Sequence, residues 1–465
     1  MKKSGFQILA AAAAAAMILC GCSDANFGDE TFLRPPRATG DEAKIQDIIS
    51  DQAGGNYSLK YPQRGDNRSA VIMRKSNAKL SDGNEKTSKS NTVEKYAVAM
   101  FSTESDSKLN ISIIAYMNGK WKCLKTFSNE GMGIDQVVFD DVDSNGTEDI
   151  IIGRTAYTGS RKKLSVYSIE NETVREITVD DTYNEMVVDD ITGDNSNEIV
   201  LISLANSGSN PAAVVYKYSE QEKTLMSNAS VPIDGEIVEF ANVISGKIDK
   251  DEKGIILDGK KSGDFLSTQV LYYNDDEGLL VNPLVDIADD GKLINVTSRK
   301  DNVVSRDADG DGIIEIPVIT QLPASVDENA ASICNLTSWN QISVKDDSLS
   351  VKMRSIINYN DGYSFVMPNE WSGGNVTALS DAENRQLRFY LWNSSTGSVG
   401  DPLLIIYRYT KYEWSDIDKH ALIELKELNE KSKNAVFAVQ IINTKSDKSL
   451  NISEQEVKNC IRLLG

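Results

Sequence analysis

One pattern recurs along the chain and constrains its fold: a short apolar strand, an acidic turn and a second apolar strand. Alternating β-branched and aromatic segments at 164–169, 213–218 and 268–273 separate the turns. Each repeat therefore holds about four short strands, the size of one β-propeller blade. The aligned copies begin at four positions that are 49, 52 and 65 residues apart: Asp141, Asp190, Asn242 and Asp307.

An earlier, degenerate repeat starts at residues 69–73. Its turn is swollen into the Lys-, Ser- and Asn-rich stretch 74–93, and its later strands are expected at 96–101 and 111–116. With this copy, the sequence predicts a mainly β chain with about five visible four-stranded blades, followed by a small α+β domain.

The acidic turns place oxygen-bearing side chains at alternate positions, with Gly or Asn supplying the left-handed backbone that curls the loop. A hard cation such as Ca²⁺ needs several oxygens at about 2.3–2.6 Å, which such loops offer. The predicted ligands are Asp141, Asp143, Asn145, the Thr147 carbonyl and Asp149 in the first loop, Asp190, Thr192, Asp194, the Ser196 carbonyl and Glu198 in the second, and Asp307, Asp309, Asp311, the Ile313 carbonyl and Glu315 in the third. The predicted bends are at Gly146, Asn195 and Gly312.

These loops resemble the Asp-x-Asp-x-Asp-Gly-x-x-Asp loops of FG-GAP and VCBS repeats in integrin-like β-propellers. The resemblance implies structural calcium that braces each blade. The third loop is its most specific copy, and Thr192 departs from the pattern. The Asn242 copy has lost its acidic run to an insertion at 247–253, and the earliest repeat has lost it too, so neither is expected to bind metal. The alternative is that acidic turns cap strands without metal.

The N-terminus carries an export signal. Lys2 and Lys3 precede an unbroken apolar run at 8–19, which is too short to span a membrane as a helix. The tetrad Leu19-Cys20-Gly21-Cys22 resembles the lipobox of bacterial lipoproteins. That resemblance implies a signal peptide at 1–21, a diacylglycerol thioether on Cys22, and a membrane anchor that holds the protein on the extracytoplasmic face. An ordinary secretory signal is the alternative.

A polar spacer is expected at 22–40 and a propeller domain at 41–350, which opens with an amphipathic helix at 40–54. The extended segment 57–62 is expected to complete the last blade and close the ring. The order of helix, Tyr57-x-Leu59-x-Tyr61-Pro62 and Ser69-Ala70-Val71 resembles the N-terminal part of repeat-bearing lipoproteins from clostridial bacteria.

Residues 351–465 are predicted to form an α+β sandwich domain. Its strands are expected at 376–380, 387–392, 403–409 and 435–442, and its helices at 415–428 and 453–463. The spacing Tyr363-x-Phe365-x-x-Pro368-x-x-Trp371 resembles the opening of PsbP-like domains. Six aromatic residues are candidates either for a ligand groove or for core packing: Trp371, Trp392, Trp414, Tyr407, Tyr409 and Tyr412.

The formal net charge of −20, which becomes −22 without Lys2 and Lys3, is repulsive to nucleic acid. His420 is the single histidine, which argues against a multi-histidine zinc site or a histidine triad. Cys123, Cys334 and Cys460 remain after export and lipidation. Because three is an odd number, at least one of these cysteines is unpaired. All three are expected to be small buried apolar side chains.

The sequence contains no recognisable catalytic constellation. Its features favour a cell-surface lipoprotein acting as a calcium-stabilised binding scaffold for an extracellular protein or glycan. The alternatives are an extracellular polysaccharide-active enzyme on a propeller and an envelope protein-assembly factor.

Overall fold

The computed structural model describes residues 39–76, 93–103, 108–155, 161–170, 172–206, 208–284, 286–287, 293–323, 333–432 and 435–464. The predicted signal peptide, Cys22, most of the spacer and most of the swollen turn lie outside these residues. Within them, no helix is both long and apolar enough to cross a membrane.

The described chain is mainly β and consists of propeller-type blades followed by a C-terminal sheet, and in blades 2 to 4 the strands follow one another in sequence order. In blade 1, β3 pairs with β1, β2 and β4. Its strands are β1 (Tyr57–Leu59), β2 (Val71–Lys75), β3 (Lys95–Thr103), β4 (Leu109–Met117) and β5 (Lys120–Asn129). Blade 2 comprises β6 (Gly133–Asp140), β7 (Asp149–Thr155), β8 (Lys162–Glu170) and β9 (Thr173–Tyr183).

Blades 3 and 4 repeat the same antiparallel order. Blade 3 comprises β10 (Glu185–Asp189), β11 (Glu198–Ser203), β12 (Ala212–Ser219) and β13 (Thr224–Pro232). Blade 4 comprises β14 (Ile237–Lys247), β15 (Lys253–Lys261), β16 (Phe265–Asn274) and β17 (Leu279–Val281), and a small ribbon of β18 (Asp286–Ile287) and β19 (Leu293–Ile294) follows it.

Blade 5 differs because the final strand of the chain joins it. Its order is β20-β21-β22-β23-β29. The strands are β20 (Ile316–Gln321), β21 (Asn335–Ser343), β22 (Ser348–Asn358), β23 (Tyr363–Val366) and β29 (Ile461–Leu463). Strand β22 thus runs across the boundary predicted at residue 350.

The unbroken apolar runs after the acidic turns form the second strand of each middle blade. They are apolar throughout because both faces of that strand are buried between sheets. Ile150 and Ile152 belong to the apolar cluster shared with blade 1, which contains Val98. Ile151 points the other way and joins Leu201 in the cluster shared with blade 3. Because side chains alternate along a strand, a continuous run of isoleucine serves two neighbouring interfaces.

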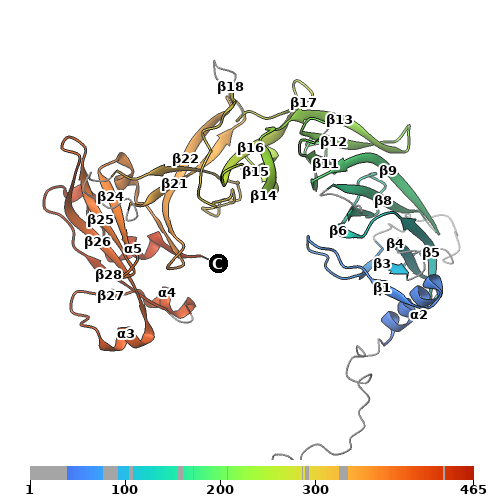
Figure 1. The fold of residues 1–465 in the computed structure, drawn as a ribbon, viewed down its shortest axis with the longest axis horizontal. Helices are drawn as coiled ribbons and strands as arrows, with labels where there is room; N and C mark the ends of the chain where they lie inside the picture. The colour runs from blue at the N-terminus through green and yellow to red at the C-terminus, as the bar shows by residue number, and fades with distance from the viewer. Residues whose placement is uncertain are drawn as a thin grey trace, which may run out of the picture.

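The blades follow one another along an open arc, with α2 (Asp41–Ala53) at one end and the C-terminal sheet at the other (Figure 1). The expectation that residues 57–62 complete the last blade is wrong, because β1 pairs with β3 of blade 1. The predicted helix is confirmed. Ile45 and Ile49 are its buried residues and pack on blade 1, and it ends at Gly54, whose φ is 68°.

The chain after β1 fastens blade 1 to its neighbours. Pro62 forms a parallel bridge with Ile134 of β6. Arg64 donates to both oxygens of buried Asp135, at 2.8 and 2.9 Å, and also pairs with Glu185 at the start of β10. One arginine therefore links this segment to two successive blades.

The C-terminal domain has a five-stranded antiparallel sheet with the order β24-β25-β26-β28-β27. Its elements are β24 (Val376–Asp381), β25 (Gln386–Asn393), β26 (Ser398–Thr410), β27 (Ile423–Glu424), β28 (Ala435–Ile441), α3 (Lys411–Asp416), α4 (Lys426–Lys431), α5 (Glu454–Cys460) and the short 3-10 helices η3 (Asn369–Gly373) and η4 (Lys448–Leu450). The four predicted strands are confirmed. Phe365 of blade 5 shares one core with Phe389 and Trp371.

Both helices predicted in this domain need correction. The predicted helix 415–428 is divided into α3 and α4, because β27 between them pairs with β28, and His420 lies exposed in the intervening turn. The helix predicted at 453–463 ends at Cys460, because the next residues form β29 on β23. The described cysteines Cys123, Cys334 and Cys460 form no disulfide with one another.

Candidate metal centre

The three predicted acidic loops share one backbone conformation. The first two connect β6 to β7 and β10 to β11, and the third precedes β20, where a single bridge between Arg306 and Glu315 replaces the first strand. The fourth and sixth residues of every loop have positive φ. These residues are Ser144 (57°) and Gly146 (84°), Gly193 (71°) and Asn195 (66°), and Gly310 (90°) and Gly312 (86°). The bends therefore lie where the sequence predicted them.

Each loop brings three carboxylates together, with one oxygen of each within 4.8 Å of the others. Of the predicted ligands, the structure gathers Asp141, Asp143 and Asp149 in the first loop, Asp190, Asp194 and Glu198 in the second, and Asp307, Asp309 and Asp311 in the third. Glu315, the predicted closing carboxylate of the third loop, is fully buried. Convergent hard oxygens are the ligands that Ca²⁺ prefers.

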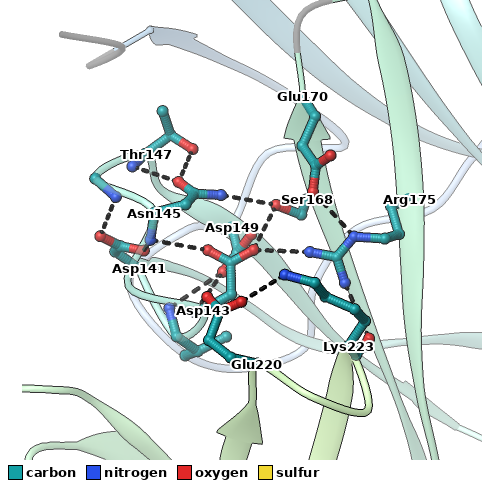
Figure 2. Close-up of polar contacts among 12 residues, drawn as sticks. Asp141, Asp143, Asn145, Thr147, Asp149, Ser168, Glu170, Arg175, Glu220 and Lys223 are labelled. Carbon is teal, nitrogen blue, oxygen red and sulfur yellow. Dashed lines mark hydrogen bonds and ion pairs between the residues drawn. The ribbon is translucent and has the colours of Figure 1, made fainter.

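The first loop is held by hydrogen bonds to its own backbone (Figure 2). Asp141 accepts from the amides of Asn145 at 3.0 Å and Gly146 at 2.8 Å. Asn145 Oδ1 in turn accepts from the amide of Thr147 at 2.8 Å. These contacts fix the loop before any ion binds, which reduces the entropic cost of binding.

Asp149 closes the first loop and is fully buried. Its Oδ2 accepts from the amides of Val142 and Asp143, but its Oδ1 has no hydrogen-bond partner among the described residues. Burial away from water raises the pKa of Asp149 to about 7. An unpaired buried carboxylate oxygen is costly, so a cation beside it would satisfy the site.

A basic residue already touches the first loop. Arg175 of β9 donates to Asp143 Oδ2 at 2.9 Å, and Ser168 of β8 donates to the same oxygen at 3.0 Å (Figure 2). Asp141 and Asp149 have no ion pair within the described chain. The first loop is thus partly neutralised and retains two carboxylates for a metal.

The second loop contains a cation of its own. The ammonium group of Lys217, on β12, contacts Asp194 Oδ2 and lies 3.7 Å from Glu198 Oε1. Thr192, the departure from the family pattern, donates its hydroxyl to Glu198 Oε1 at 2.7 Å. Asp190 Oδ1 is buried without a hydrogen-bond partner in the described part of the chain. One positive charge therefore already faces two of the three carboxylates of this loop, Asp194 and Glu198.

The third loop lacks such a cation. Gln341 of β21 donates one amide nitrogen to Asp311 Oδ2 at 2.8 Å and to Glu315 Oε1 at 2.7 Å. Among the described residues, no lysine or arginine forms an ion pair with Asp307, Asp309, Asp311 or Glu315. The carboxylate set of the third loop fits Ca²⁺ best, because the whole charge remains to be balanced.

Sequence reasoning missed the residues that face the closing carboxylates. One equivalent position on the third strand of each blade faces the closing carboxylate, and it holds Ser168, Lys217 and Gln341. The strand registers that establish this equivalence are Ile150↔Tyr167, Ile199↔Tyr216 and Ile316↔Asn340. The repeated Val-Tyr before Ser168 and before Lys217 is the sequence signal that would have aligned the first two.

In blade 4 the alignment on Asn242 is wrong, because β14 continues to Lys247 and Asn242 lies within that strand. Its amide donates to Asp258 Oδ2 at 3.1 Å. Gly254 occupies the position of the closing carboxylate, one residue before the pair Ile255↔Leu271. Among the described residues, the three acidic groups that could hold a metal lie outside this blade.

No protein family and no curated protein matches the sequence at a significant level. Among solved structures, a protein from Lactobacillus plantarum is 12% identical, with 71% of this chain and 94% of that chain covered and a TM-score of 0.29. The periplasmic gluconolactonase of Pseudomonas aeruginosa is 12% identical over 75% and 95% of the two chains, with a TM-score of 0.27. A putative 6-phosphogluconolactonase from Bacteroides uniformis is 13% identical over 66% and 80%, also with a TM-score of 0.27. Similarity this low carries no functional argument.

Proposed function

We propose that this chain is a lipoprotein of the extracytoplasmic membrane face that acts as a calcium-stabilised binding scaffold for an extracellular protein or glycan. The observation that carries the proposal is the convergence of three carboxylates in each of three equivalent loops. Calcium in the first and third loops would brace blades 2 and 5 of an array that presents a long rigid surface. The ion would be structural.

The metal assignment is supported by unsatisfied charge. Buried Asp149 Oδ1 lacks a partner within the described residues, and the carboxylates of the third loop face a neutral glutamine. Both arrangements leave negative charge that a divalent cation would balance. We therefore assign calcium to the third and first loops, while Lys217 substitutes for it in the second.

Thermal unfolding in calcium and in chelator tests the metal assignment. A ligand that binds only the folded form stabilises it by RT ln(1 + [L]/Kd). With a Kd of about 10⁻⁴–10⁻³ M, 10 mM Ca²⁺ would add about 1.4–2.7 kcal/mol at each site. The melting temperature should rise by several degrees in calcium and fall again when the ion is chelated.

Two matched double variants distinguish the loss of loop ligands from an equal change in net charge. Asp309→Ala with Asp311→Ala removes two carboxylates from the third loop and should blunt the response. Asp275→Ala with Asp276→Ala removes the same charge from an exposed turn of blade 4 and should leave the response intact. Equal responses in both double variants, or none in the wild type, would count against calcium in these loops.

A further inference from the structure

The junction between blade 5 and the C-terminal sheet contains a cleft that the calcium loops do not use. It has a volume of about 230 Å³ and is lined from both sides, by blade 5 and by β24 and β25. That volume holds seven or eight waters at about 30 Å³ each. It is also about the size of one small ring with its substituents. Ligand sites commonly occupy such junctions between domains.

The floor of the cleft is mainly apolar, with buried Thr337 as a polar member of the lining. Val303, Ile356 and Leu387 line it and are buried, and Ile319 and Cys334 lie beside them. Burial raises the pKa of the Cys334 thiol to about 12, so that side chain is neutral. The floor therefore matches the C–H face of a ligand better than a charged group.

The rim supplies unused hydrogen-bonding groups. Tyr359, Asn360 and Ser380 line the cleft, and their side chains form no hydrogen bond with any described residue. Amides and hydroxyls both donate and accept, which suits a ligand rich in hydroxyl groups. Among the described residues, the lining contains no lysine or arginine, the residues that recognise phosphate and carboxylate. Asp301 is the carboxylate among these lining residues, and it accepts from Asn335 at 2.9 Å.

The residues at the entrance are held in place. Tyr359 and Asn360 sit in the turn between β22 and β23, where Asn358 donates to Asp361 Oδ2 at 2.9 Å and the Asp361 amide donates back to Asn358 Oδ1 at 3.1 Å. Gly362 completes the turn with a φ of 75°. Tyr359 is 58% exposed, so its ring is available for stacking on a ligand.

From the apolar floor, the neutral rim side chains that no described residue engages and the ordered tyrosine, we infer that this cleft binds one ring of an uncharged sugar. The inference rests on the proposed binding function and selects glycan over protein as its ligand. The C–H face of the ring packs on the floor and against Tyr359, while its hydroxyls bind Asn360 and Ser380. The small volume restricts the site to a single residue of a longer chain.

Titration with glucose, galactose and N-acetylglucosamine tests the inference, with saturation-transfer NMR and calorimetry as the readouts. At least one of the sugars should bind saturably, and Tyr359→Ala and Asn360→Ala should each weaken it by about tenfold or more. Tyr61→Ala removes a tyrosine that is 60% exposed in the segment after β1 and does not line the cleft, and it should change nothing. Each of these side chains is exposed, so the variants should fold.

No saturable binding of any of the three sugars, or unchanged affinity in both cleft variants, would overturn the inference. The calcium response of the same samples distinguishes the two proposals. A calcium-dependent rise in melting temperature without sugar binding would refute the sugar site and leave the calcium scaffold standing. Sugar binding without a calcium response would refute the calcium assignment and leave the sugar site.

Discussion

Lys217 and Glu198 face each other across neighbouring strands of blade 3, with the ammonium nitrogen 3.7 Å from the carboxylate oxygen Oε1 that closes the second loop. Gln341 occupies the same position in blade 5 and hydrogen-bonds to Glu315. The residue at this position therefore changes how much negative charge the loop retains. Together with Arg175, which pairs with Asp143 in the first loop, it ranks the loops for calcium in the order third, first, second.

Exchanging these residues should exchange the metal preference of the two loops. Lys217→Gln removes a positive charge from the second loop, so that loop should gain a calcium site, and calorimetry should register one additional equivalent. Gln341→Lys should remove the site from the third loop, because the ammonium group would repel the ion. Lys217→Arg keeps the charge and serves as the control. Unchanged stoichiometry in both exchanged variants would refute this ranking.

Asp149 should make the metal-free protein less stable as the pH rises. Its folded pKa is about 7 and the usual unfolded value is about 3.9, so the native state holds a proton that the unfolded state has lost between these values. The free energy of unfolding should therefore fall from pH 5 to pH 8 in the presence of a chelator. Asp149→Asn should flatten that slope in urea titrations.

Calcium and an exposed carboxylate provide the controls for this pH dependence. Millimolar calcium should reduce the slope, because the ion stabilises the ionised form of Asp149. Asp275→Asn, on an exposed turn, should keep the wild-type slope. A slope that is the same in Asp149→Asn and in the wild type would show that another group is responsible.

Local chemistry made the loops and the first helix predictable. Asp, Gly and Asn at fixed offsets encode the positive φ values of Gly146, Asn195 and Gly312 without reference to the rest of the fold. The periodicity of Ile45 and Ile49 likewise encodes the buried face of α2. The apolar runs revealed the strands because both of their faces are buried.

Contacts between distant segments were not predictable in this way. The Val-Tyr pair before Lys217 could align it with Ser168, but only the strand register places it opposite Glu198. The same holds for Ile423, whose pairing with Val439 interrupts the predicted helix. β1 joins β3 of blade 1, a partner that the short segment 57–59 does not itself specify. The cleft at Tyr359 arises only from the junction of two sheets.

A buried ion pair should be essential to blade 4. The side chains of Arg299 and Asp258 are both fully buried and lie 2.8 Å apart, and Asp258 Oδ2 also accepts from the Ser305 amide at 2.7 Å. Arg299→Met leaves Asp258 charged without its partner, which typically costs about 3–5 kcal/mol. The midpoint of urea unfolding, followed by tryptophan fluorescence, should fall sharply.

An exposed pair on the same strand is the matched control. Lys260 and Glu239 lie 3.2 Å apart with exposed side chains, and such pairs contribute about 0–1 kcal/mol. Lys260→Met should therefore shift the midpoint little. Adding Asp258→Asn to Arg299→Met should recover part of the lost stability, because it removes the uncompensated charge. Equal shifts from Arg299→Met and Lys260→Met would contradict a special role for the buried pair.

Cys22 should determine where the protein is found after export. Two or more acyl chains hold a protein on a bilayer stably. A single chain gives a membrane association constant of only about 10⁴ M⁻¹, which allows reversible release. In a bacterial host, the wild type should sediment with membranes, and mass spectrometry should detect lipid on the Cys22 peptide. Cys22→Ser should lose both properties. Cys20→Ser changes the neighbouring cysteine of the signal and should keep both. An unlipidated wild type in the soluble fraction would refute the anchor, and it would leave the calcium loops and the sugar cleft to be judged on their own tests.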